Sequence, residues 1–353
     1  MIRGPACGLA TGQHEKGSEN WSPLVSVVIP TYNRAQQTIA ALESVLAQTY
    51  TNFEIIVVDD GSTDDARKAI QRFINERAGG CQPIFFLGQS RQGASAARNL
   101  GIAKALGEFI AFLDSDDLWL PEKLNDQVQA IGQFGNDCGA CFTDAHLVDS
   151  SGMDESSFQA YRRNYQQTVG MDRDATMSLA NSFAGLWLST LLVRSDLVRR
   201  IGGLDPDIQF AEDRDFHFRL SLVTSFVYVN RQLIRTDRTP SPPGSASRPW
   251  DKVEVQFQGQ QSMLEKWLKM DVALPPKIRR IVARNLGALH SHRANWYLEN
   301  GRYREARQAV SSAVKYKVTF GTATKWALTW LAPAFVRRVT PKTRPIGTGG
   351  HAS

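Results

Sequence analysis

Three carboxylates in four positions follow a short apolar run, and they are the residues of this chain best suited to do chemistry. Residues 109–113 are all apolar, and Asp114, Asp116 and Asp117 come directly after them. Such a run is typical of a strand buried on both faces. Three acids at its end repel one another and resist desolvation unless a cation lies among them. Mg²⁺ and Mn²⁺ suit such oxygen ligands and complete their shell with substrate phosphates. The stretch predicts a phosphate-bearing substrate, with a solvated acidic turn as the alternative.

Polar residues also follow two earlier strands. Residues 25–30 end in Thr31-Tyr32-Asn33-Arg34, and residues 53–58 end in Asp59-Asp60-Gly61-Ser62. Segments with helical periodicity alternate with these strands, which predicts βαβ units and a mainly parallel sheet. Because ligands bind at the carboxyl ends of parallel strands, the three polar clusters are expected at one sheet edge. The glycine-rich dinucleotide and P-loop signatures are absent, so a bound phosphate is expected to be held through a metal.

A second acidic pair occurs much later, where Glu212 and Asp213 begin a helical segment over 210–220. Acids in a first turn are favoured by the helix dipole, so capping is the alternative to a functional role. Between the two acidic sites, residues 144–174 are polar and long enough to form a lid or an excursion over the site. The chain therefore holds two candidate acidic sites, about 100 residues apart in sequence.

Five separated motifs together resemble the family 2 glycosyltransferases. In chain order they are 25–34, 56–64, Gly93 with Ala97-Arg98-Asn99, 113–119, and Gly202-Gly203 with Glu212-Asp213. The resemblance covers about residues 23–240. It implies an α/β fold of the GT-A nucleotide-diphospho-sugar transferase type, Rossmann-like with a mainly parallel sheet. From residue 250 onward the pattern is helical, which predicts a C-terminal helical extension.

The resemblance also implies roles for individual residues on the donor side. It places Thr31, Tyr32 and Arg34 beside the nucleotide base and ribose, and Asp60 as an acceptor from the base. Arg98 would help to hold the nucleotide sugar, and Asp114 would contact the ribose. Asp116 and Asp117 are the expected ligands of a divalent cation, Mn²⁺ or Mg²⁺, on the diphosphate of a UDP- or dTDP-sugar.

On the acceptor side, Asp213 in the Glu212-Asp213 pair matches the catalytic base of this inverting family. A single in-line displacement needs a base for the acceptor hydroxyl and a cation on the leaving diphosphate. We therefore expect sugar transfer to a glycan or lipid-linked acceptor, in cell-surface polysaccharide synthesis. A nucleotidyltransferase and a sugar-nucleotide or glycan-binding module without turnover stay open as alternatives. Many relatives carry an arginine and a histidine after the last core strand, but residues 233–238 contain no histidine.

The domain organisation follows from composition and charge. We expect a flexible leader over 1–22, a GT-A domain over 23–240, a Pro-rich linker over 241–249 and a basic helical region over 250–353. From residue 277 onward the chain holds 15 Lys and Arg against two acids, although the net charge of all 353 residues is only +6. A basic, aromatic helix over 325–338 suits an anionic membrane surface or packing on the body, with nucleic acid the weakest option. Without a signal peptide or a disulfide framework, a cytoplasmic location is expected, peripheral on the inner membrane face if the tail binds lipid.

Overall fold

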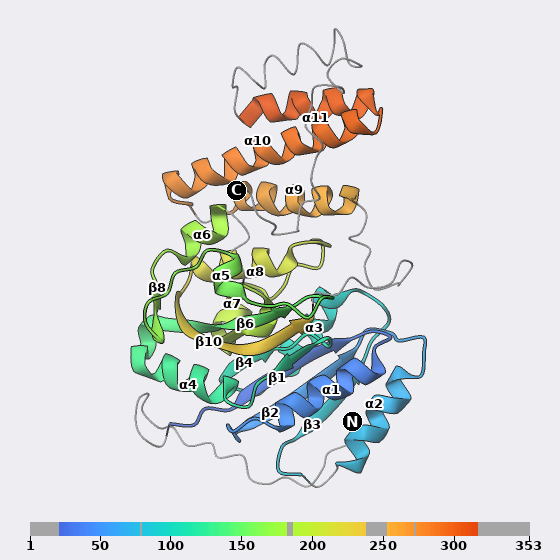
Figure 1. Cartoon of the computed structure of the whole chain (residues 1–353), viewed down its shortest axis with the longest axis vertical. Coiled ribbons are helices and arrows are strands. Elements are labelled where there is room, and N and C mark those ends of the chain that lie inside the picture. Colours follow the sequence, from blue (N-terminus) through green and yellow to red (C-terminus); the bar gives the residue numbers. More distant parts are fainter. Residues whose placement is uncertain (1–20, 78–79, 182–185, 238–252, 272, 317–353) are drawn as a thin grey trace. The chain divides into compact units, whose positions relative to one another are not determined.

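The computed structural model describes residues 21–77, 80–181, 186–237, 253–271 and 273–316 (Figure 1). These residues form two compact units. The sheet unit comprises described residues 21–179, 186–207 and 212–237, without 78–79, and the helical unit comprises 180–181, 208–211, 253–271 and 273–316. Most of the expected leader, all of the expected linker and the basic segment 325–338 lie outside the described residues.

The sheet unit is built on one mixed sheet with strand order β3-β2-β1-β4-β9-β6-β10-β5. Strands β1 to β4 are mutually parallel, β6 and β10 are parallel to each other, and β9 runs antiparallel between β4 and β6. The mainly parallel sheet predicted from the sequence is confirmed. The strands of this path are β1 (Val25–Thr31), β2 (Phe53–Asp59), β3 (Ile84–Gly88), β4 (Phe109–Phe112), β5 (Asp117–Trp119), β6 (Cys138–Val148), β9 (Leu191–Arg194) and β10 (Ser225–Asp237).

Helices cover both faces of the sheet (Figure 1). The first face carries α1 (Ala35–Leu46), α2 (Ala66–Glu76) and α4 (Lys123–Phe134). Their apolar residues share one core cluster with alternate residues of β1, β2 and β4, and α4 packs on β6 and β10. The other face carries α3 (Ala94–Lys104) and α8 (Glu212–Ser221). There, Phe216 of α8 lies edge to face with Phe112 of β4, with ring centroids 5.7 Å apart. This packing places the start of α8 on the same side of the sheet as α3.

The polar stretch expected as an excursion contains short elements of its own. The stretch 144–174 begins within β6 and contains β7 (Asp154–Ser156), α5 (Ser157–Ala160) and β8 (Val169–Asp172). Helix α6 (Ala175–Asn181) follows it, and α7 (Ser195–Arg200) comes after β9. Strand β7 pairs with β6 and strand β8 with β10, so the excursion extends the sheet. Residues 182–185, between α6 and β9, are not among the described residues.

The helical unit contains α9 (Val253–Lys269), α10 (Pro276–Glu299) and α11 (Tyr303–Tyr316). Helices α10 and α11 form a hairpin whose turn contains Gly301 at φ +74°, a left-handed conformation that glycine adopts without strain. Tyr297 and Leu298 of α10 pack against Ala306 and Val310 of α11. The expected C-terminal helical extension is confirmed. No helix in the described part of the chain is long and apolar enough to cross a bilayer.

Candidate active site

The acidic turn after β4 separates its three carboxylates into three environments. The turn closes through the Asp117 amide, which donates to the Asp114 carbonyl at 3.0 Å, and Asp117 then starts β5. The Asp114 amide donates to the hydroxyl of Ser189, just before β9. The sequence predicted a cation among these acids, and the structure supplies two from the protein itself, Arg98 and Arg34.

Arg98 of α3 joins the acidic turn to the start of α8. Its guanidinium lies 2.5 Å from Asp114 Oδ1 and 3.5 Å from Glu212 Oε1, and the residue is only 5% exposed. Burial opposes the charge of Arg98, but the two carboxylates outweigh it and raise the pKa of Arg98 further above its ordinary value. A permanently charged, planar group is well suited to bridge two carboxylates. Arg98 thereby brings the predicted donor-side and acceptor-side acids together.

The predicted metal ligands differ in exposure. The Asp116 side chain is 49% exposed and forms an ion pair with Arg34 at 2.7 Å. Asp117 is buried, and burial together with the charges of Asp114 and Asp116 raises its pKa to about 8. Hydrogen bonds from Ser189 and Thr236 offset only part of this rise. Burial and the neighbouring carboxylates therefore favour the protonated form of Asp117, and positive charge beside it would favour the ionised form.

The carboxylate oxygens of Asp116 and Asp117 are ligands of the kind that a divalent cation prefers. No group of three or more His, Cys, Asp or Glu side chains converges on one point within the described ranges. Mg²⁺ is commonly bound by one or two carboxylates, with substrate phosphates and water in the other positions. Positive charge beside Asp117 would also favour its ionised form. The site therefore suits a cation that arrives with a diphosphate rather than a cation caged by protein alone.

Asp60, at the end of β2, fixes the loop that leads into α3. Its Oδ1 accepts from the Gln89 side chain and from the Gln92 amide, and its Oδ2 accepts from the Gly93 amide, each at 2.8 Å. Gly93 lies at φ +95°, so the loop needs glycine at this point. Asp60 is 5% exposed. In this arrangement its carboxylate positions the N-terminus of the helix that carries Arg98.

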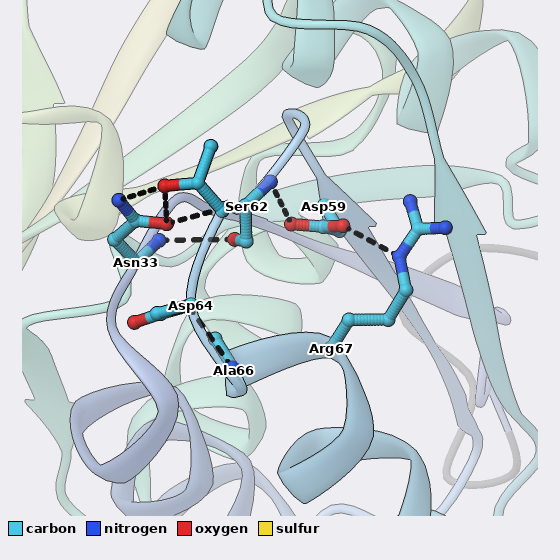
Figure 2. A network of polar contacts seen from close by, with 7 residues as sticks. Asn33, Asp59, Ser62, Asp64, Ala66 and Arg67 are labelled. Atoms are coloured by element: carbon cyan, nitrogen blue, oxygen red, sulfur yellow. Dashed lines mark hydrogen bonds and ion pairs between the residues drawn. The ribbon is translucent and has the colours of Figure 1, made fainter.

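The neighbouring Asp59 has a separate task, which Figure 2 shows. It accepts from the Ser62 amide at 3.0 Å and from Arg67 Nε at 2.9 Å. Asn33 lies at φ +51°. Its backbone amide donates to the Ser62 hydroxyl at 3.0 Å, which links the loop after β1 to the loop after β2 (Figure 2). These contacts fix the two strand-end loops against each other.

The first loop also positions the predicted nucleotide contacts. The Thr31 hydroxyl donates to the hydroxyl of Thr38 at 2.7 Å, since Thr38 donates its own hydrogen to a backbone carbonyl. The hydroxyl of Tyr32 accepts from Arg91 at 2.6 Å, and the Arg91 guanidinium lies 4.0 Å from the centre of the tyrosine ring. Thr31 is buried and packed into α1, whereas Tyr32 and Arg91 form a cationic, aromatic edge to the loop.

The start of α8 carries the predicted base. Burial and the charge of Glu212 raise the pKa of Asp213 to about 7, within the range where a carboxylate works as a general base near neutral pH. Burial also raises the pKa of Glu212, which is held by Arg98. One turn later His217 is fully buried, and burial lowers its pKa to about 3, so it stays neutral. Glu212 forms an ion pair with Arg98, whereas Asp213 forms no ion pair with it.

Comparison with known proteins identifies this part of the chain. The sequence model of glycosyl transferase family 2 matches residues 26–189. These residues form a glycosyl transferase family 2 domain. An uncharacterized glycosyltransferase of Rickettsia typhi is 29% identical over 216 residues, which are 61% of this chain and 64% of the relative. TuaG of Bacillus subtilis, a glycosyltransferase named for teichuronic acid biosynthesis, is 38% identical over 135 residues, which are 38% of this chain and 51% of the relative. The matched region thus spans less than two thirds of either relative.

Solved structures confirm the GT-A fold. Residues 1–349 of TarS from S. aureus, in complex with UDP-GlcNAc, superpose with a TM-score of 0.60 at 19% identity and cover 89% of each chain. The mannosyltransferase PcManGT of Pyrobaculum calidifontis, in complex with GDP-Man and Mn²⁺, gives a TM-score of 0.55 at 18% identity, covering 92% of this chain and 89% of the other.

Three residues of this candidate site were not predicted from the sequence. Ser189 and Thr236 hydrogen-bond to Asp117, and Arg91 packs on Tyr32. Arg91 carries a usable signal, because it is a basic residue two positions before the glycine that starts a helix. Ser189 and Thr236 carry none, since small hydroxyl residues far along the chain reach the site only through the pairing of strands.

Proposed function

We propose that this protein is an inverting glycosyltransferase that moves a sugar from a nucleotide-diphosphate sugar to a hydroxyl group of a glycan or lipid-linked acceptor. The observation that carries the proposal is the bridge made by Arg98 between Asp114 and Glu212. It holds a donor-side acid and the acid next to the candidate base in one cluster. A reaction in which a diphosphate leaves and a hydroxyl group attacks needs functional groups on the donor side and a base on the acceptor side.

On the donor side, Asp116 and Asp117 would hold a divalent cation, and Thr31, Tyr32, Arg34 and Asp60 belong to the loops that would receive the nucleotide. The cation, when bound, supplies neutralisation of the charge that develops on the leaving diphosphate. The family relationship supports a nucleotide-sugar donor, and we favour UDP- or dTDP-sugars. Arg98 and Arg34 add fixed positive charge at the same sheet edge.

On the acceptor side, Asp213 would accept the proton of the attacking hydroxyl. Its raised pKa supports this role, because a base that titrates near 7 is strong enough to take the proton and still largely ionised just above neutrality. Glu212 would act as a positioning residue through its contact with Arg98. A nucleotidyltransferase does not need a carboxylate in the position of Asp213, and a binding module does not need one with a raised pKa.

Incubation with UDP- or dTDP-sugars and Mn²⁺, with and without chelator, tests the donor half of the proposal. We expect slow release of the free nucleoside diphosphate that chelator suppresses and that Asp116→Ala abolishes. Release that neither the chelator nor this substitution affects would refute the metal role. Release of pyrophosphate would instead support nucleotidyl transfer.

We further propose that the enzyme works in cell-surface polysaccharide synthesis at a cytoplasmic membrane face. TuaG is named for teichuronic acid biosynthesis, which supports a glycan acceptor. The basic chain beyond residue 277 supports attachment to anionic lipid. A chain without residues 317–353 should no longer sediment with anionic liposomes. If the truncated and full-length chains sediment equally, the tail is not the anchor.

A further inference from the structure

A polar pocket in the sheet unit lies outside the cluster described above. It has a volume of about 480 Å³, which is within the range of small-molecule sites. Its walls come from the end of β6, from β7 and α5, from the loop that follows α5 and from the middle of β10. The residues that line it are Asp144, His146, Ser156, Phe158, Gln159, Arg163, Asn164, Tyr165, Asn230, Arg231 and Gln232.

The walls of this pocket are fixed by internal hydrogen bonds. Asp144 accepts from Ser156, Ser157 and the Phe158 amide at 2.5–2.9 Å and so anchors the start of α5. The side-chain amide of Asn230 donates to the Tyr165 carbonyl at 2.9 Å and closes the opposite wall. A pocket that is already formed loses less conformational entropy when a ligand binds.

The basic side chains of the lining already have carboxylate partners. His146 lies 2.9 Å from Asp154, Arg163 lies 2.7 Å from Asp172, and Arg231 is paired with Asp126. An anionic ligand would therefore compete with a carboxylate for each of these groups. The lining also offers four side-chain amides, and within the described residues the side-chain amides of Gln159 and Gln232 form no hydrogen bond, although the Gln159 backbone amide donates to the Ser156 hydroxyl. An amide both donates and accepts, which matches a hydroxyl group.

The pocket is connected to the reaction centre through β10. Gln232 lines the pocket, and Thr236, four residues later on the same strand, hydrogen-bonds to Asp117. At the rise of an extended strand these residues are at most about 13 Å apart. The pocket opens from the excursion between β6 and β9, which does not carry the predicted donor-binding residues. The pocket and the acidic cluster therefore lie along the same strand.

We propose that this pocket is a subsite for an uncharged, polyhydroxylated part of the acceptor, namely neutral sugar units of a glycan chain. The inference rests on the proposed function. It adds the chemical class that the acceptor presents away from the attacked hydroxyl. Gln159 and Gln232 are the residues that would select it.

Saturation-transfer NMR on the full chain tests the proposal with maltose, cellobiose and N,N′-diacetylchitobiose as probes. Inorganic phosphate, followed by ³¹P line width, is the anionic comparison. The double variant Gln159→Leu, Gln232→Leu removes the two unbonded amides and keeps similar side-chain volumes. Gln129→Leu, at an exposed position of α4, is the matched control.

We expect at least one disaccharide to bind the parent and the control, with a Kd at least about tenfold higher in the double variant, since each lost hydrogen bond contributes about 1 kcal/mol. UDP binding should be equal in all three proteins. Disaccharide binding that is absent from the parent or unchanged in the double variant would overturn the inference, as would phosphate binding that the double variant loses. A protein that binds a disaccharide but neither binds UDP nor consumes a donor would contradict the proposed function and leave the subsite supported.

Discussion

We expect the ion-pair bridge that Arg98 makes with Asp114 and Glu212 to contribute strongly to the free energy of unfolding of the sheet unit. In Arg98→Met the apolar chain is kept and the charge is removed, so Asp114 and Glu212 face each other without a cation. The Arg98 side chain is 7% exposed, and those of its partners are 32% and 24% exposed. Breaking a buried ion pair costs about 3–5 kcal/mol. Because the two carboxylates left without a partner retain some access to water, we expect a loss of stability at the lower end of this range, about 3 kcal/mol.

That loss is large enough to measure by thermal or urea unfolding. For a unit of this size, about 3 kcal/mol corresponds to a melting temperature roughly 6–12 °C lower. The matched control is Arg77→Met, whose ion pair with Glu43 is 41% and 56% exposed and should contribute at most about 1 kcal/mol. The difference in stability between Arg98→Met and wild type should become smaller as the pH falls, because protonation of the two carboxylates removes their repulsion. If Arg98→Met is no less stable than Arg77→Met, the bridge does not organise the site.

The remaining predictions concern Asp213 and the packing of α3. Since Asp213 has a pKa raised to about 7, kcat/KM should rise about tenfold per pH unit up to that value and then level off. The same shift makes the folded protein bind an extra proton between about pH 4 and 7, so wild-type stability falls as pH rises there. Asp213→Asn should therefore melt higher than wild type at pH 8 and converge with it below pH 4; equal melting at pH 8 would contradict the shift. In Gly101→Ala the new Cβ would lie 2.4 Å from Val28 Cγ1, which should cost about 1–3 kcal/mol in urea unfolding, whereas Gly80→Ala should be close to neutral.

The strands and their polar ends could be predicted because each signal is local. Continuous apolar runs specify buried strands such as β2 and β4, and the residues after them must lie at the carboxyl edge of a parallel sheet. Asp60 and Asp114 were therefore placed at the correct edge from sequence. The short strand β5 was not predicted, because three residues that begin with an acid carry no strand pattern, and their pairing with β10 is set by tertiary structure.

The partners of the acids could not be predicted from local patterns. Glu212 meets Arg98 across 114 residues of sequence, and the Asp114 amide meets Ser189 across 75. From the sequence alone, a metal is expected to compensate all three acids of the turn, whereas in the structure Arg98 pairs with Asp114 and Arg34 pairs with Asp116. The pocket beside α5 is a further case, since its walls come from separate segments that only the sheet brings together.

In the proposed mechanism, Asp213 is the base of a sugar transfer whose donor is bound elsewhere in the same cluster. The most direct test compares wild type and Asp213→Asn in two assays, calorimetric binding of UDP with Mn²⁺ and release of UDP from a donor sugar. We predict that the variant binds UDP with a Kd within about twofold of wild type and releases it at least about 100-fold more slowly, because a general base contributes about 10²–10⁴ in rate. A variant that binds UDP and turns over as fast as wild type would show that the base lies elsewhere.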